Sequence, residues 1–367
     1  MPGFDELANA WISGLLTYEP GRPIEEVARE LGFAGAEEIV KLASNENAMG
    51  PSPKAVDAMT AAAGAMHRYP DGGCFYLKRA LADKLGVEPE QILPGNGSNE
   101  LIELLGHVFL SPENSIVMGS QAFVVYRLVA MAARAETVAV AMPEFTHDLP
   151  SMLEAIDEKT RIVFISNPNN PTGTIVDQAA IDAFMREVPD SVVVCFDEAY
   201  IELLPASRQP DVLKYVREGR NVVVLRTFSK VYGLAGLRIG YAVAPSACIA
   251  LLHKVRQPFN VNAMAQAAAL AALADDDHVR KTREMVADGL AFIGSELDKL
   301  GIAYVPSVTN FMLARLGKGR QAFEALQREG VIVRPMDGYG LLEHVRITVG
   351  LPEENRKLIE ALGRVEL

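Results

Sequence analysis

The sequence contains few of the residues that build disulfide frameworks and metal centres. Its 367 residues include three cysteines, Cys74, Cys195 and Cys248, which are far apart and odd in number. Cysteines in that pattern are typical of reduced thiols. The six histidines do not have the spacing of a metal site. We therefore predict neither a disulfide framework nor a bound metal.

The sequence also lacks long apolar runs and a net positive charge. No run approaches the roughly 18 apolar residues that a membrane-spanning helix requires. The N-terminal stretch MPGFDELANAWISGLL has no basic region and no small-residue cleavage site, so we expect a protein that stays in the cytoplasm. The net charge of −12 argues against a nucleic-acid surface, which needs clustered lysine and arginine. Small molecules are the expected partners.

Short apolar runs recur from about residue 50, separated by stretches rich in alanine and leucine. They are SIVMG, TVAVAM, RIVFIS, SVVVCFDEAY, NVVVLRTFS and RIGYAVA. Runs without polar alternation are typical of strands buried on both faces, and the intervening helices suit crossover connections. This pattern predicts a large α/β domain with a mostly parallel sheet.

The two ends of the chain have a different pattern. YVPSVTNFMLARL, VIVRPM and HVRITVG alternate polar and apolar residues better, which predicts a smaller α+β domain. The first 40 or so residues predict an extended arm and a short helix that starts near Pro23. We predict an arm and the start of the small domain at 1–45, a large domain at 46–262 and a C-terminal small domain at 263–367.

Polar residues follow several of the predicted strands. NVVVLRTFSK runs from a buried strand into Lys230, whereas a lone lysine most often extends to solvent. At the carboxyl end of a sheet strand, a lysine with a lowered pKa can instead act as a nucleophile. Asp197 ends another apolar strand, where a buried carboxylate needs a cation or hydrogen-bond donors. Tyr200 follows closely enough to face the same ligand.

Two loops complete the set of motifs. In LPGNGSNELIELL, small residues precede a helix, which suits either a phosphate cradle or an ordinary helix N-cap. The stretch lacks the third glycine of a dinucleotide fingerprint and the Lys-Ser/Thr of a P-loop. ISNPNNPTG predicts a rigid turn after its strand, because proline and asparagine favour turns.

Together these motifs resemble the fold-type I pyridoxal-phosphate enzymes, and among them the class I and II aminotransferases. The resemblance covers nearly the whole chain, in the order of the family. Within that group, KLASNENAMGPSP, RYPDGG, GNGSNELIELL, NPNNPTG, DEAY, TFSKVYGLAGLRIGY and VRPMDGYG with HVRITVG resemble the histidinol-phosphate aminotransferases. The resemblance implies a large domain with a mostly parallel seven-stranded sheet, a smaller α+β domain, and pyridoxal 5′-phosphate as cofactor.

The resemblance also implies a role for each matching residue. Lys230 would bond covalently to the cofactor and carry protons, Asp197 would pair with the pyridine nitrogen, and Asn170 and Tyr200 would bind the ring oxygen. Phe123 would stack on the ring, where many relatives have tyrosine. The cofactor phosphate would contact Gly97, Ser98, Asn99, Thr227, Ser229 and Arg238, together with Tyr69 from the second subunit of a homodimer. The substrate would contact Tyr18, Asn47, Arg334 and Arg346.

The implied function is transamination between L-histidinol phosphate and 2-oxoglutarate in histidine biosynthesis. An aromatic amino-acid aminotransferase and a decarboxylase or lyase of the same fold stay open as alternatives. A DNA-binding regulator built on this domain is disfavoured, because the chain lacks a basic extension. A hydrolase using Ser229 and Lys230 is also disfavoured, since adjacent strand residues point to opposite faces.

Overall fold

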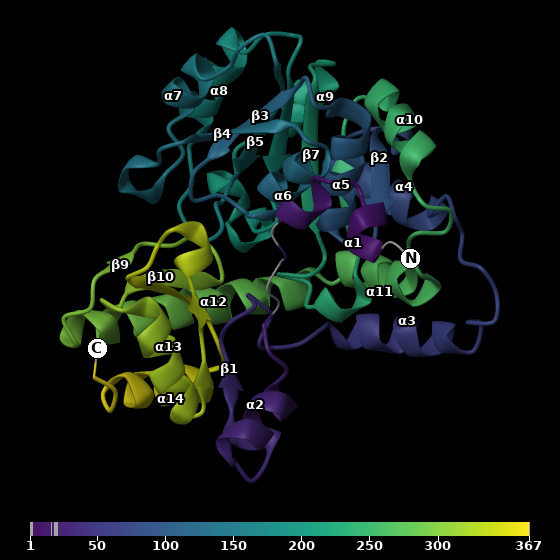
Figure 1. Cartoon of the computed structure of the whole chain (residues 1–367). Helices are drawn as coiled ribbons and strands as arrows, with labels where there is room; N and C mark the ends of the chain where they lie inside the picture. The colour runs from purple at the N-terminus through teal and green to yellow at the C-terminus, as the bar shows by residue number, and fades with distance from the viewer. Residues whose placement is uncertain (1–2, 16, 18–20, 367) are drawn as a thin grey trace.

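A seven-stranded sheet forms the centre of the large domain in the computed structural model, which describes residues 3–15, 17 and 21–366 (Figure 1). In spatial order its strands are β2 (Ile92–Gly95), β8 (Gly240–Val243), β7 (Val222–Thr227), β6 (Val193–Asp197), β5 (Thr160–Ser166), β3 (Ser115–Gly119) and β4 (Glu136–Val140). Only β8 is antiparallel to its neighbours. The predicted large domain with a mostly parallel sheet is confirmed.

Helices cover both faces of this sheet, as the unalternating strands predict. On one face lie α5 (Ser98–Phe109), α6 (Val125–Ala132) and α10 (Ser246–Val255). The other face is covered by α4 (Phe75–Leu85), α7 (Leu149–Glu154), α8 (Gln178–Glu187), α9 (Leu213–Arg217) and α11 (Ala263–Leu273), with α3 (Pro53–Ala63) packed on α11. Within β5, Val163 and Ile165 enter one core while Ile162 and Phe164 enter the other.

The small domain has its own antiparallel sheet and core, and the α+β prediction is confirmed. The sheet order is β12 (Arg334–Pro335), β13 (His344–Thr348), β10 (Phe311–Arg315) and β9 (Tyr304–Val305). A separate parallel pair joins β1 (Val40–Lys41) to β11 (Val331–Ile332). The helices of this domain are α12 (Asp276–Lys299), α13 (Gly319–Arg328) and α14 (Pro352–Leu362), with α2 (Ile24–Leu31) beside β1.

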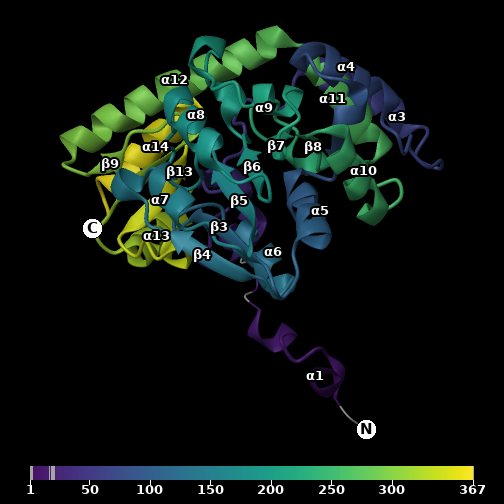
Figure 2. The ribbon, with the colours of Figure 1, turned by 90° about the horizontal axis from the view of Figure 1, so that it is seen from above.

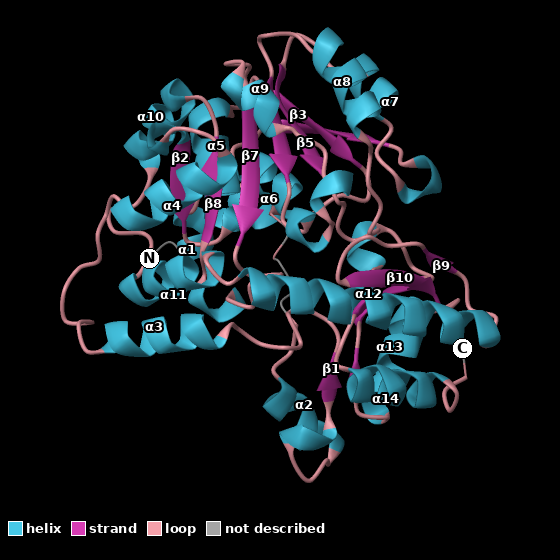
Figure 3. Cartoon of the chain, turned by 180° about the vertical axis from the view of Figure 1, so that it is seen from behind, coloured by secondary structure: helices cyan, strands magenta, loops and turns pink. Residues whose placement is uncertain are grey.

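The long helix α12 connects the two domains (Figure 3). Val279 near its start packs in a large-domain core, whereas Ile293 packs in the small-domain core. The alanines of α11 also belong to the large-domain core. The predicted boundaries 1–45, 46–262 and 263–367 stay a proposal, and this packing favours moving the second boundary into α12.

The N-terminal arm leaves the body of the molecule. Its first helix, α1 (Phe4–Leu7), lies well away from both domains (Figure 2), and Phe4 is 92% exposed. Within the part of the chain that the structure describes, no helix combines the length and apolar character needed to cross a membrane. Among those same residues, no three histidine, cysteine, aspartate or glutamate side chains gather as metal ligands would.

Candidate active site

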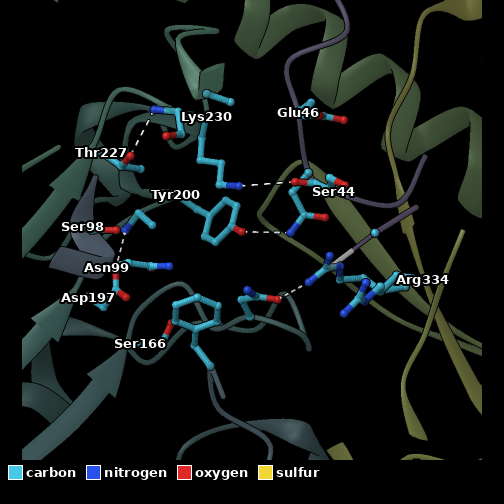
Figure 4. A pocket seen from close by; sticks show the side chains of 18 of the residues that line it. Ser44, Glu46, Ser98, Asn99, Ser166, Asp197, Tyr200, Thr227, Lys230 and Arg334 are labelled. Atoms are coloured by element: carbon cyan, nitrogen blue, oxygen red, sulfur yellow. Dashed lines mark hydrogen bonds between the residues drawn. The ribbon is translucent and has the colours of Figure 1, made fainter. Parts of the chain in front are cut away.

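A cavity of about 290 Å³ lies where the carboxyl ends of the central strands face the small domain. This is the position at which open α/β sheets bind ligands. The lining contains most of the predicted site residues: Ser98, Asn99, Phe123, Asn170, Asp197, Tyr200, Thr227, Ser229, Lys230, Arg238, Arg334 and Arg346. Motifs far apart in the sequence therefore meet in one place (Figure 4).

Lys230 extends into this cavity from the large domain (Figure 4). Strand β7 ends at Thr227, and Lys230 follows in a bend rather than on the strand itself. Its Nζ lies 3.5 Å from the carbonyl oxygen of Ser44 and 5.6 Å from the centre of the Tyr200 ring. The amine is thus held among polar and aromatic groups, where it can react with a ligand in the cavity.

Asp197 is the last residue of β6 and is buried at the floor of the cavity. Burial raises the pKa of its carboxyl, while a hydrogen bond from Tyr126, another from the backbone, and the charge of Lys230 act in the opposite direction. The hydroxyl of Tyr126 donates to Oδ2 at 2.7 Å, and the N–H of Ala199 donates to Oδ1 at 3.2 Å. Both oxygens are oriented, so this carboxylate is prepared to receive a cationic or N–H group.

The loop before α5 forms a cradle for an anion. Gly97 has φ of +82°, and a Cβ there would stand 2.5 Å from Nη2 of Arg238. The positive φ favours glycine, and a side chain here would displace the Arg238 guanidinium from the cradle. Ser98 and Asn99 begin α5, whose N-terminal N–H groups and dipole favour negative charge. The buried hydroxyls of Thr227 and Ser229 line the same end of the cavity.

Arg238 completes the cradle in an unusual backbone conformation, with φ of +55°. Positive φ is strained for a side-chain-bearing residue and occurs preferentially at functional sites. Its guanidinium hydrogen-bonds the carbonyl of Ala235 at 3.1 Å and faces the backbone at Gly97. A guanidinium beside helix N–H groups is well suited to a phosphate.

The middle of the cavity contains Tyr200, Asn170 and Phe123. The hydroxyl oxygen of Tyr200 accepts a hydrogen bond from Nδ2 of Asn45 at 2.9 Å. Burial raises the pKa of Tyr200 to about 12, so its hydroxyl stays protonated and can donate. Phe123 meets the Tyr126 ring edge-on, with 5.7 Å between the ring centres.

Two arginines from the small domain also line the cavity, and Arg334 lies across it from Lys230 (Figure 4). Arg334 on β12 and Arg346 on β13 are direct cross-strand partners. Arg346 donates to Oδ1 of Asn170 at 2.5 Å and to the carbonyl of Ala43 at 2.9 Å. Like charges placed opposite each other in a sheet repel, and an anion bound by both would offset that repulsion.

Four predicted residues lie outside the cavity lining or outside the described chain, and one of them, Gly97, belongs to the cradle beside it. Tyr69 is 82% exposed and stacks on Phe259 with 4.7 Å between ring centres. Asn47 donates to the carbonyl of Val231 at 3.0 Å and to Oγ1 of Thr282 at 3.1 Å. Tyr18 falls outside the described residues.

The sequence analysis missed several residues that the fold brings to the site. Ser44, Asn45 and Tyr339 line the cavity, and Tyr126 supports Asp197 from beneath. Asn45 stands in the quoted stretch KLASNENAMGPSP, as the first residue of its Asn-Glu-Asn (NEN) segment at 45–47, which the resemblance linked to the site only through Asn47. Tyr126 lies in an apolar helix, where an aromatic residue is usually part of the core.

Comparisons with known proteins agree with this geometry. The family "Aminotransferase class I and II" matches residues 37–362. The histidinol-phosphate aminotransferase of Akkermansia muciniphila is 51% identical over 98% of this chain and 99% of its own length. That of Moorella thermoacetica is 47% identical over 96% of this chain and 92% of its own.

A solved structure gives the same result. The crystal structure of histidinol-phosphate aminotransferase from Sinorhizobium meliloti in complex with pyridoxal-5′-phosphate superposes with a TM-score of 0.86, at 28% identity. The match covers 96% of this chain and 95% of that one. Family match, relatives and fold therefore coincide, and the chain belongs to the class I and II aminotransferases, within their histidinol-phosphate aminotransferase family.

Proposed function

We propose that this chain is a pyridoxal-phosphate-dependent transaminase that exchanges an amino group between L-histidinol phosphate and 2-oxoglutarate in histidine biosynthesis. One observation carries the proposal. A single cavity holds a primary amine at Lys230, a buried carboxylate at Asp197 and, across from them, the paired arginines Arg334 and Arg346. The relatives named above, at about half of all positions identical, support the same reaction.

The residues present fit the cofactor. A Cβ at Gly97 would meet the Arg238 guanidinium, and the N-terminus of α5 with Arg238 suits a phosphate. Both oxygens of Asp197 are oriented by donors, as a partner for a protonated ring nitrogen requires. Bound pyridoxal phosphate would supply the electron sink that stabilises negative charge on the substrate α-carbon.

The chain's own groups would then divide the remaining work. Lys230 would hold the cofactor through its Nζ and, once displaced by substrate, move a proton from the substrate α-carbon. Asp197 would keep a proton on the ring nitrogen, because a buried carboxylate favours an adjacent cation. Tyr200 and Asn170 would bind the ring oxygen, with Phe123 against the ring face.

The arginine side would bind the anionic groups of the two substrates. Glutamate has two carboxylates, whereas histidinol phosphate has a phosphate, and a guanidinium fork fits either anion. Arg346 and Arg334 both line the cavity, so each is placed to contact such a group. Asn47 donates hydrogen bonds to the carbonyl of Val231 and to the hydroxyl of Thr282. It would therefore position the backbone next to Lys230 rather than contact the substrate.

The direct test is an assay of purified protein with histidinol phosphate, 2-oxoglutarate and added cofactor. We expect stoichiometric glutamate and the corresponding keto phosphate, with Lys230→Ala as the inactive control. Elimination of phosphate from histidinol phosphate without glutamate would favour the lyase alternative, and release of carbon dioxide from an L-amino acid offered in its place would favour the decarboxylase. Faster turnover of phenylalanine or tyrosine would favour an aromatic aminotransferase.

We also propose a cytoplasmic homodimer in which Tyr69 reaches the partner's cofactor phosphate. Phe259, which stacks on Tyr69, is exposed, as are Phe75 and Tyr76 a few residues along the chain, and exposed aromatics support an interface. Mixing a Lys230→Ala subunit with a Tyr69→Ala subunit should recover roughly a quarter of native activity, because one site in each mixed dimer regains both groups. Mixed dimers that form yet stay inactive would contradict the shared site.

A further inference from the structure

The segment Ala43–Ser44–Asn45 contacts three groups of the active site in succession. The carbonyl of Ala43 accepts from Arg346 at 2.9 Å, and that of Ser44 lies 3.5 Å from Nζ of Lys230. Nδ2 of Asn45 then donates to the hydroxyl oxygen of Tyr200 at 2.9 Å. The first two contacts use backbone carbonyls, which any residue would provide. The contact with Tyr200 uses the Asn45 side chain, so it depends on which residue stands at position 45.

We propose that Asn45 is a positioning residue that orients the hydroxyl of Tyr200, so that this hydroxyl donates its proton into the cavity. The inference rests on the proposed function, since the acceptor would be the ring oxygen of bound pyridoxal phosphate. A hydroxyl has one proton. If its oxygen already accepts from Asn45, that proton is available to a ligand.

The direction of the Asn45 amide follows from its other partners. The backbone N–H of Asn45 donates to Oγ1 of Thr348 at 2.9 Å, and that hydroxyl donates to Oδ1 of Asn45 at 3.1 Å. With Oδ1 engaged by a donor, Nδ2 is directed at Tyr200. Among the described residues, the Thr348 hydroxyl has no other hydrogen-bond acceptor, so a flipped amide would leave its proton without a partner.

The backbone of Asn45 is fixed as firmly as its side chain. Its φ is +55°, a left-handed conformation that asparagine tolerates better than most residues. The residue is 1% exposed, and its carbonyl accepts from Nδ2 of Asn310 at 3.0 Å. The donor to Tyr200 therefore has little freedom to turn away.

Three charged groups lie near Tyr200 and also act on a ligand oxygen beside it. Arg346 approaches from β13 and Lys230 from the loop after β7, while Asp197 lies on the same strand end as Tyr200. The two cations favour negative charge on a nearby ligand oxygen, and Asp197 opposes it. The Asn45 contact differs from these because it sets a hydrogen-bond direction rather than a field.

The test exchanges the donor for an acceptor of the same shape. Asn45→Asp should draw the Tyr200 proton toward residue 45, away from the cavity. We expect the cofactor-free protein to bind pyridoxal phosphate about tenfold more weakly, as for one lost hydrogen bond, by equilibrium dialysis. The visible absorbance of the bound cofactor should titrate about one pH unit higher. Asn45→Leu, which frees the hydroxyl without turning it, should give a smaller change.

Two controls separate this effect from the added charge and from damage to folding. In a Tyr200→Phe background the Asn45→Asp shift should shrink, because only the charge effect remains. The same exchange at Asn355, which is equally buried but lies in the small domain on α14, should leave affinity and titration unchanged. Neutron diffraction of the cofactor-bound native protein should place the Tyr200 deuterium in the cavity.

Several results would overturn the inference. They are equal shifts in the native and Tyr200→Phe backgrounds, an Asn45→Asp protein that binds and titrates like native, or a Tyr200 deuterium directed at Asn45. A native protein that binds no pyridoxal phosphate would instead overturn the proposed function, so the two failures are distinguishable.

Discussion

The two sides of the cavity are built in different ways. On the large-domain side, Asp197, Thr227 and Lys230 follow the ends of neighbouring parallel strands, and helices bury both faces of that sheet. On the small-domain side, Arg334 and Arg346 stand on an antiparallel sheet with its own core, connected through α12. The first side supplies the chemical groups and the second supplies anion contacts, and the two meet through the hydrogen bond from Arg346 to Asn170.

The largest expected effect is on the chemical side. Lys230→Ala should abolish transamination and the visible absorbance of the bound cofactor, because it removes both the bonding amine and the proton carrier. The fold should persist, since the side chain lies in a cavity rather than in a core. Circular dichroism and a single-turnover assay check both points. Full activity would exclude the proposed chemistry.

Asp197→Asn should give the next largest loss. The amide cannot hold a proton on the ring nitrogen by charge, so the barrier should rise by about 2.7–4 kcal/mol, as for one preorganised electrostatic contact. Cofactor should still bind through the phosphate cradle. Turnover numbers under saturating substrate measure the effect, and an unchanged value would place the ring nitrogen elsewhere.

Changes on the arginine side should be smaller and should depend on the substrate. Arg346→Ala should slow both half-reactions, and Arg334→Ala should slow mainly the histidinol-phosphate half, each by about 1.5–3 kcal/mol for one charged hydrogen bond. Rapid-mixing measurements of each half-reaction separate the two. If Arg334→Ala affected both halves equally, the two arginines would not have distinct substrates.

The last expected effect is on stability rather than on activity and lies outside the cavity. Glu202 is buried near Arg226 and Glu198, and burial raises its pKa to about 7 from a reference value of 4.5. The folded protein then binds more protons than the unfolded chain across that interval, so this contribution to stability is lost as pH rises through about 7.

Glu202→Gln should therefore flatten the fall in stability between pH 5 and 8, by about 3 kcal/mol at most. The melting temperature of the cofactor-free protein across that range is the measurement. Asp298→Asn, at a carboxylate on the outer end of α12, is the matched control. A native-like pH dependence in Glu202→Gln would show that another group titrates.

The sequence could indicate which large-domain residues line the cavity, because most of them follow a recognisable strand or precede a helix. The supporting contacts could not be predicted in the same way. Tyr126 precedes its partner Asp197 by 71 residues, and Asn45 bonds Thr348 across 303. Both pairings depend on tertiary packing. It places helix α6, which carries Tyr126, against the end of β6, and it places Asn45, with its left-handed backbone, beside β13.

Asn47 illustrates the same limit from the other direction. The NEN stretch indicates a polar segment near the pocket, but not which asparagine faces it. In an extended segment Asn45 and Asn47 would point to the same face. The positive φ of Asn45 interrupts that pattern, so Asn45 contacts Tyr200 whereas Asn47 contacts Val231 and Thr282. Local patterns located the segment, whereas its orientation required the fold.

The central claim is that the arginine side selects a phosphate-bearing amine for a fixed transamination centre. Single-turnover kinetics of the cofactor-loaded protein with histidinol phosphate, histidinol and phenylalanine test it most directly. We predict that removing the phosphate slows the reaction at least about 100-fold, as expected when two charged hydrogen bonds are lost. Equal rates for histidinol phosphate, histidinol and phenylalanine would contradict the account and indicate an aromatic aminotransferase.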